Sequence, residues 1–145
     1  MAAVTPQVST TLKFTLRTGT VYYMQDRDCC SPEPHFYIVV NADPLTDQCV
    51  VLAIASSQYE KVKMRRKFLP QETLVEISPE EYSELTKETI IDCNNCFIRP
   101  LSEIDEKLKN KEIRNHDDLP EQILEKIIAG LHASPMIAED IKEML

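Results

Sequence analysis

Residues 35–55 decide the fold, and they read HFYIVV (35–40), NADPLTDQ (41–48) and CVVLAIA (49–55). The first and last of these stretches are apolar runs rich in β-branched and aromatic residues, with the length of a buried strand. The eight residues between them are rich in Asn, Asp and Pro, which favour turns. We therefore predict two adjacent strands joined by a hairpin loop, the second of them central and covered on both faces.

Further strands are expected on both sides of this hairpin, because short apolar runs alternate with turn residues through the first hundred positions. Gly19 marks one turn, and residues 25–34 form a polar loop. The segment SPEE (78–81) has the pattern of a capping box and predicts a short helix that ends near Leu85. The additional expected strands cover residues 10–16, 20–24, 73–77 and 89–98.

After Pro100 the pattern changes from strand to helix. Ser102 is expected to cap a helix over 103–110, and Asp118 precedes a longer helix. Apolar residues recur along one face of that longer helix, which usually packs on a core and less often forms a groove for a partner helix. Ser134 and Pro135 open a last helix. We predict one α+β domain over 1–145, with a compact antiparallel barrel or curled sheet over about 10–100 and a helical part over 101–145.

Composition excludes several classes of protein. With 43% hydrophobic and 28% charged residues, the 145-residue chain has the balance of a folded domain and not of a disordered one. Its two glycines, Gly19 and Gly130, are too far apart for a glycine-rich phosphate loop. No apolar run is long enough to span a bilayer, and the first residues lack a secretory signal. We therefore expect a soluble cytoplasmic protein with no membrane partner.

The charges are unevenly distributed. The formal net charge is −8, but residues 1–67 carry +2 and residues 68–145 carry −10. On a strand or an extended loop, alternate cations in 61–67 would project to one side at intervals of about 6.6–7 Å, close to the spacing of phosphates in single-stranded nucleic acid. The sequence thus predicts an RNA-binding segment, with a solvated loop as the alternative. Its five cations are Lys61, Lys63, Arg65, Arg66 and Lys67.

The five cysteines favour reduced thiols, because the chain shows no export signal and an odd count does not complete a disulfide framework. Cys93 and Cys96 form a CxxC motif, and Cys29 and Cys30 are adjacent. A zinc site normally has two well-spaced pairs, and a redox CxxC lies at a helix N-terminus, whereas strand-like sequence follows Cys96. We expect ordinary buried thiols with no metal and no cofactor; a zinc or thiol-redox module is a remote alternative.

Candidate catalytic residues lie at the ends of the two strongest strands. His35 begins the first strand, and Ser56 and Ser57 end the second. An imidazole moves protons near neutral pH, and RNA cleavage can use the substrate's own 2′-hydroxyl as nucleophile, with no metal and no covalent intermediate. His35 and Ser57, helped by a cation such as Lys61 or Arg65, would suffice if they share a cleft. The structural alternative is a core histidine and two turn-forming serines.

At the level of element order, the chain resembles the PemK/MazF-like toxin family. GTVYYM (19–24) resembles the opening Gly-x-Ile-Trp-x-Val strand of that family, and HFYIVVN (35–41) falls where the family has Arg-Pro before an apolar strand. VVLAIASS (50–57) resembles the strand that ends in Pro-x-Thr-Ser. The stretch from TIIDCNN (89–95) to Ser102 resembles the later strand that leads into a helix. The resemblance spans about residues 18–145, with few identical side chains.

This resemblance implies an SH3-like small barrel with added helices that dimerises, cleaves single-stranded RNA without metal and is inhibited by the acidic tail of an antitoxin. The family's catalytic arginine corresponds to His35, and its Thr/Ser position corresponds to Ser56 and Ser57. Histidine in place of arginine removes a permanent cation that contacts phosphate bidentately. Two functions follow as hypotheses: a toxin-like endoribonuclease, or a non-catalytic barrel that binds a peptide or protein as a regulatory module.

Overall fold

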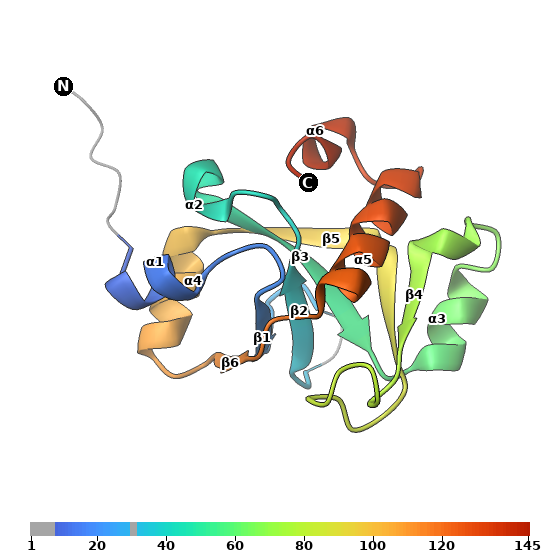
Figure 1. The fold of residues 1–145 in the computed structure, drawn as a ribbon, viewed down its shortest axis with the longest axis horizontal. Coiled ribbons are helices and arrows are strands. Elements are labelled where there is room, and N and C mark those ends of the chain that lie inside the picture. Colours follow the sequence, from blue (N-terminus) through green and yellow to red (C-terminus); the bar gives the residue numbers. More distant parts are fainter. Residues whose placement is uncertain (1–7, 30–31) are drawn as a thin grey trace.

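The computed structural model describes residues 8–29 and 32–145, so Cys30 of the adjacent cysteine pair lies outside the described residues. Its centre is a six-stranded antiparallel sheet in the order β4-β5-β3-β2-β1-β6 (Figure 1). The strands are β1 (Val21–Met24), β2 (His35–Val39), β3 (Cys49–Ser56), β4 (Leu74–Ile77), β5 (Thr89–Pro100) and β6 (Arg114–His116). The helices are α1 (Thr10–Thr15), α2 (Pro44–Asp47), α3 (Tyr59–Arg65), the 3₁₀ turn η1 (Gln71–Thr73), α4 (Leu101–Lys109), α5 (Glu121–Ala133) and α6 (Glu139–Lys142).

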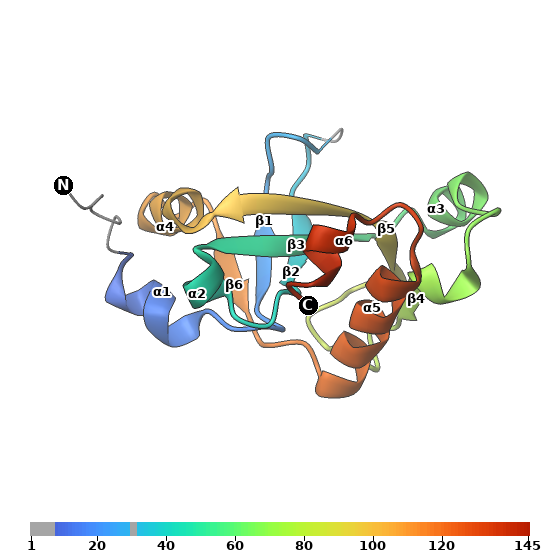
Figure 2. The same cartoon turned by 90° about the horizontal axis from the view of Figure 1, so that it is seen from above.

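The α+β class is confirmed, but the sheet is open. Figure 2 shows β1 running steeply across the direction of β3 and β5, so the sheet is strongly curled. Its edge strands β4 and β6 each pair with a single neighbour, and within 8–29 and 32–145 no pairing joins the two edges into a closed barrel. An open curled sheet leaves the ends of its strands accessible between the covering helices.

The hairpin predicted over residues 35–55 is confirmed. Tyr37 pairs with Ile54 and Val39 pairs with Leu52, while β3 lies between β2 and β5 as the sequence predicts. The connecting loop contains the short helix α2, whose cap Asp43 accepts a hydrogen bond from the backbone N–H of Thr46. It ends at Gln48 with a φ of 59°, the left-handed conformation that stops a helix.

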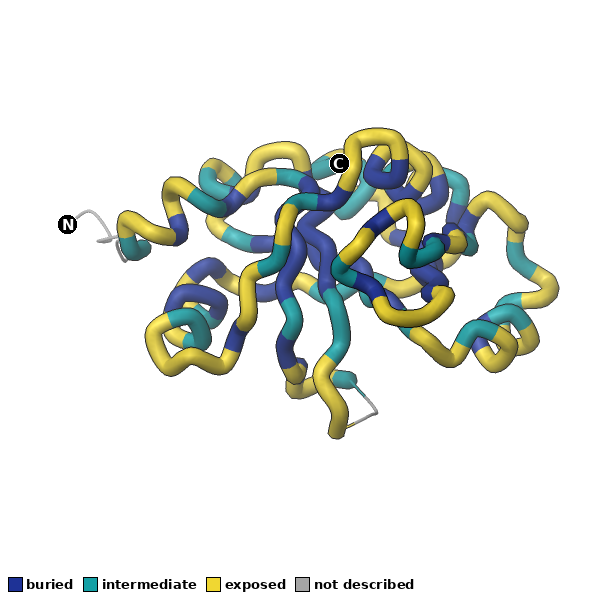
Figure 3. Tube along the Cα trace, turned by 60° about the horizontal axis from the view of Figure 1, so that its bottom comes forward, coloured by how far each residue is buried: buried dark blue, intermediate teal, exposed yellow. Residues whose placement is uncertain are grey.

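Helices cover both faces of the sheet, and each face has its own apolar core. Helix α5 covers one face (Figure 1), and its Ile127 and Leu131 belong to the same apolar core as Ile38 and Ala53 of the sheet. On the other face, Leu12 of α1 and Ile104 of α4 pack around Tyr22, Tyr37 and Leu52. Burying one such side chain contributes roughly 1.5–3 kcal/mol, so both cores stabilise the fold substantially. Figure 3 shows the buried residues concentrated along the central strands.

The predicted strand over residues 10–16 is wrong, because this segment forms helix α1. Alternation of Leu12, Phe14 and Leu16 suggested a strand, but only Leu12 and Leu16 are buried, and Phe14 is 79% exposed. Burial four residues apart is the spacing of one helix face. Ser9 caps the helix, since its hydroxyl accepts a hydrogen bond from the backbone N–H of Leu12 at 3.2 Å.

The predicted helix over 78–85 is also wrong. The capping interaction is present, because the backbone N–H of Ser78 donates to the carboxylate of Glu81 at 3.2 Å, but the chain forms two separate turns and no continuous helix. Tyr82 donates its hydroxyl to the carbonyl of Asp117, and both Tyr82 and Leu85 are buried in the core beneath α5. These contacts direct the chain toward β5 instead of letting the helix continue.

Two of the predicted C-terminal helices are confirmed as α4 and α5, but the last helix, α6, begins at Glu139 after its cap Ala138 and not at Ser134 and Pro135, because Ser134 instead ends α5. Helix α4 begins at Leu101 after Pro100, so Ser102 lies inside the helix and does not cap it. Strand β6 was not predicted, because Arg114, Asn115 and His116 contain no apolar run and were read as the loop entering α5. Pairing with the free edge of β1 imposes the strand conformation on them.

Candidate functional site

The sheet brings His35 and the two serines to one end. His35 begins β2 opposite Met24, the last residue of β1, and β3 ends at Ser56. The register that pairs Tyr37 with Ile54, continued by two residues, sets His35 opposite Ser56. Because directly opposite residues of an antiparallel pair share a face, the imidazole and the Ser56 hydroxyl lie on the same side of the sheet.

Ser56 and Ser57 line two different cavities, and His35 lines both. The first, here called the Ser56 cavity, has a volume of about 200 Å³ and is also lined by Arg65, Asp92 and Cys29. The second, the Ser57 cavity, has a volume of about 210 Å³ and is also lined by Tyr23 and Lys87. Successive residues of a strand point to opposite faces, which explains why the adjacent serines separate.

The His35 side chain is half-buried, and one ring nitrogen has no partner. Its Nε2 atom is buried and makes no hydrogen bond within the described part of the chain. Most buried polar atoms are hydrogen-bonded, since leaving one unpaired costs about 1–3 kcal/mol. His35 lines both cavities, but its unpaired Nε2 atom is closed off from solvent in this conformation, so a ligand reaches it only if the neighbouring side chains move.

The basic segment over residues 61–67 is not extended. Residues Tyr59–Arg65 form helix α3, with Val62 buried, so the one-sided row of cations predicted from alternate positions is wrong. Lys63 pairs with Glu76 of β4 at 2.6 Å. The exposed Lys67 lies over the ring of Phe68, and Lys61 is also exposed. Only Lys61, Lys63 and Arg65 lie in the helix, whereas Arg66 is its C-cap and Lys67 follows it, so the five cations do not form one row.

Two arginines of this segment converge on Asp92, a residue that the sequence reasoning did not select. Arg66 Nε lies 2.9 Å from Asp92 Oδ2, while Arg65 Nη2 lies 4.0 Å from the same oxygen. Asp92 is only 4% exposed, and its other oxygen accepts hydrogen bonds from the backbone and side-chain N–H groups of Asn94. The sequence signal for Asp92 is a carboxylate within the apolar stretch TIIDC (89–93), because a buried acid needs hydrogen-bonding or cationic partners.

A buried polar network continues from Asp92 into the helical layer. The Asn94 side chain donates to Thr73 at 2.9 Å and accepts from the Ser134 hydroxyl at 2.7 Å. It thereby joins β5 to the turn η1 and to the end of α5. The network fixes the carboxylate of Asp92, and hence the two arginines, relative to the sheet.

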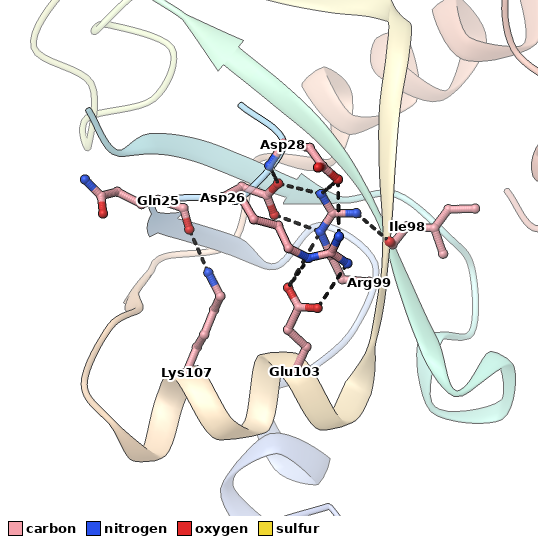
Figure 4. Close-up of polar contacts among 8 residues, drawn as sticks. Gln25, Asp26, Asp28, Ile98, Arg99, Glu103 and Lys107 are labelled. Carbon is pink, nitrogen blue, oxygen red and sulfur yellow. Dashed lines mark hydrogen bonds and ion pairs between the residues drawn. The ribbon is translucent and has the colours of Figure 1, made fainter. Parts of the chain in front are cut away.

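Arg99 holds the loop between β1 and β2 against the sheet. Its guanidinium, on β5, contacts the carboxylates of Asp26 and Asp28 in the loop and of Glu103 on α4 (Figure 4). Burial alone would raise the pKa of Asp26, but hydrogen bonds from Arg99 and from the backbone N–H of Asp28 hold it below its ordinary value. This cluster positions Asp28 and Cys29, which line the Ser56 cavity.

The two cysteines of the CxxC motif, Cys93 and Cys96, lack the features of a reactive site. Burial raises the pKa of the Cys93 thiol to about 12 and also raises the pKa of Cys96, so neither favours the reactive thiolate. Cys29, Cys49, Cys93 and Cys96 are all free. Among the residues in 8–29 and 32–145, no group of three or more His, Cys, Asp or Glu side chains could hold a metal ion.

No protein-family model matches this chain, and no curated protein matches it. The resemblance in element order therefore stays a hypothesis. None of the helices in the described part of the chain is both long and apolar enough to cross a membrane.

Proposed function

We propose that this chain is a metal-independent endoribonuclease that cleaves single-stranded RNA, in the manner of the PemK/MazF-like toxins. The Ser56 cavity is the observation that supports this proposal. An imidazole, a hydroxyl, a guanidinium and a carboxylate line one space of about 200 Å³, supplied by His35, Ser56, Arg65 and Asp92. These groups can supply a base, a hydrogen-bond donor and a cation to a phosphodiester.

In the proposed reaction the substrate supplies its own nucleophile. Once bound RNA displaces the groups that bury Nε2, His35 accepts the proton of the 2′-hydroxyl through this unpaired nitrogen, and the 2′-oxygen forms a bond to the adjacent phosphorus. The bond from phosphorus to the 5′-oxygen breaks, and that oxygen takes a proton from solvent while His35 returns its own proton to solvent. The products are a 2′,3′-cyclic phosphate and a 5′-hydroxyl.

The different distances of the two arginines from Asp92 support a division of roles. Arg66, at 2.9 Å, holds the buried carboxylate, whereas Arg65, at 4.0 Å and with 58% of its side chain exposed, keeps donors available. Arg65 can therefore neutralise the charge that develops on the phosphorane, and the Ser56 hydroxyl can donate to a phosphate oxygen. Arg65 thus takes the place of the permanent cation that His35 cannot provide.

An SH3-like barrel related to the curled sheet, a homodimer and an acidic antitoxin belong to the same proposal. An acidic tail would compete with RNA for Arg65 and for the exposed Lys61 and Lys67, because both ligands carry repeated negative charge. Cleavage by the chain alone would then be controlled by the amount of its partner.

Purified full-length chain, incubated with 5′-labelled single-stranded RNA and EDTA, tests the proposal. We expect fragments that end in 2′,3′-cyclic phosphate, and a loss of rate of about 10²–10⁴-fold in His35→Ala. Ser56→Ala should lose more activity than Ser57→Ala, whereas Ser102→Ala on α4 should cleave like the wild type. A larger loss of activity in Ser57→Ala than in Ser56→Ala would place the reaction in the Ser57 cavity. Equal activity of all variants would refute the proposed nuclease.

A second candidate function is a non-catalytic module that binds an acidic peptide or a protein. The observation that favours it is the pairing of Lys63 with Glu76 and of Arg66 with Asp92, which leaves fewer cations for phosphates. If intact RNA survives incubation with the chain while an acidic peptide binds, this second function replaces the first.

A further inference from the structure

A third cavity lies on the α4 side of the β1–β2 loop and takes no part in the proposed reaction. Its volume is about 520 Å³, and we call it the Tyr23 cavity. Its lining includes one aromatic residue, three basic residues and one acidic residue, namely Tyr23, Lys107, Lys111, Arg114 and Glu112. An aromatic ring among cations is the combination that binds single-stranded nucleic acid, in which bases stack and phosphates pair with cations.

The ring of Tyr23 is held in place by its neighbours. Tyr23 pairs across the sheet with Phe36 on one side and with Arg114 on the other. Its ring centroid lies 4.8 Å from that of Phe36 and 6.1 Å from that of His116. Directly opposite residues project to the same face, so Arg114 stands beside the tyrosine ring.

The cations of the Tyr23 cavity form fewer ion pairs than those in and beside helix α3. Lys111 and Arg114 form no ion pair with any of the described residues, and both are exposed. Lys107 donates one hydrogen bond to the backbone carbonyl of Gln25 at 2.8 Å, which leaves two ammonium donors. A phosphate can therefore bind here without breaking an ion pair, whereas at Lys63 or Arg66 it would have to displace a carboxylate.

The three cavities adjoin one another around the end of the sheet. The Tyr23 cavity and the Ser57 cavity share Tyr23 and Pro34, and the Ser57 cavity and the Ser56 cavity share His35. The three cavities are therefore neighbours, and the side chains that they share lie between them. The Tyr23 cavity lies near the proposed reaction centre.

We propose that the Tyr23 cavity binds a nucleotide of single-stranded RNA away from the cleaved bond, with a base stacked on Tyr23 and phosphates paired with Lys111 and Arg114. The substrate class rests on the proposed function, but the site does not require catalysis. It adds a second RNA-binding surface to the one that Lys61, Arg65 and Lys67 supply.

A binding experiment with an uncleavable probe tests this site. The probe is a fluorescein-labelled 2′-O-methyl RNA of ten randomised positions, which binds without a free 2′-hydroxyl and is measured by anisotropy with the full chain. Tyr23→Leu should weaken binding by about 5- to 150-fold, while Tyr23→Phe, which keeps the ring, should bind like the wild type. Retained binding in Tyr23→Leu would overturn the stacking role.

Salt dependence tests the two cations. Lys111→Gln combined with Arg114→Gln should reduce the slope of log affinity against log salt by about 1.4, the value for two lost contacts with a single strand. The control, Lys13→Gln combined with Lys126→Gln, has the same net charge and should keep the wild-type slope. Equal slopes in the two double variants would show attraction by overall charge only and would refute the site.

The same samples distinguish this site from the proposed function. Binding of the probe that depends on Tyr23, without cleavage of ordinary RNA, would refute the nuclease and support the site. Cleavage that is unaffected by Tyr23→Leu and by the double variant would support the nuclease and refute the site.

Discussion

Arg99 and Asp26 form a two-pronged ion pair, with Arg99 Nε 2.9 Å from Asp26 Oδ2 and Arg99 Nη2 2.5 Å from Asp26 Oδ1. Both residues are almost fully buried, at 5% and 7% exposure. Because Asp26 begins the loop that delivers Asp28 and Cys29 to the Ser56 cavity, this pair links the stability of the fold to the geometry of the candidate site.

Asp26→Ala should lower the free energy of unfolding by about 3–5 kcal/mol, because it leaves the Arg99 guanidinium buried with incomplete compensation. Asp28 and Glu103 still contact Arg99, so we expect a loss near the lower end of that range. Urea unfolding followed by circular dichroism measures it. Asp118→Ala is the matched control, since its partner Arg17 is 61% exposed, and it should cost less than about 1 kcal/mol. Equal losses would contradict a structural role for the buried pair.

The same aspartate should make the fold sensitive to acid. Its pKa in the folded protein lies below the value of about 3.9 expected in the unfolded chain, because Arg99 and the backbone of Asp28 outweigh the effect of burial. The stabilisation is therefore complete above the unfolded pKa and is lost as the pH falls through the folded pKa. Asp26→Asn should show a smaller decrease in unfolding free energy between about pH 5 and pH 2 than the wild type. An unchanged pH dependence would show that other carboxylates are responsible.

The strands were predictable where apolar residues alone determine the structure. The runs 35–40 and 49–55 became β2 and β3 because both faces of each strand are buried. Prediction failed where the pattern suits two structures or where the partner is distant in sequence. The spacing of Leu12 and Leu16 fits a strand and a helix equally well. The helix is favoured because Ser9 caps it. Strand β6 exists only because β1 offers a free edge.

The candidate site was predictable only in part, for similar reasons. Strand order and register bring His35 and Ser56 together, and both follow from the hairpin sequence. Asp92 and Arg99 could not be selected, because their importance depends on partners 26 and 73 residues away. The basic segment shows the opposite case. Its charges were evident in the sequence, but helix α3 changed their direction and acidic neighbours neutralised several of them.

Gly130 should be intolerant of even one added carbon. A Cβ built there would lie 2.6 Å from the carbonyl oxygen of Glu72 and 2.9 Å from the sulfur of Cys93. Alanine is the better helix former by about 1 kcal/mol, but this contact with backbone should reverse the sign and destabilise Gly130→Ala by about 1–3 kcal/mol. Glu125→Ala, on the exposed side of the same helix, should leave stability nearly unchanged. A stabilised Gly130→Ala protein would mean that α5 packs less closely on η1.

The CxxC motif should be chemically inert in the folded protein. The Cys93 sulfur is buried 3.5 Å from the carbonyl of Ile127, and burial raises its pKa to about 12, so the thiolate is scarce near pH 8. Iodoacetamide should leave Cys93 unmodified in the native state and alkylate it in urea, as followed by mass spectrometry of peptides. Cys96, with a pKa also raised by burial, should react slowly as well. Rapid formation of a Cys93–Cys96 disulfide without unfolding, or stoichiometric zinc in the purified protein, would contradict the packing described for β5. Slow modification of both residues would show that burial on β5 protects the two thiols.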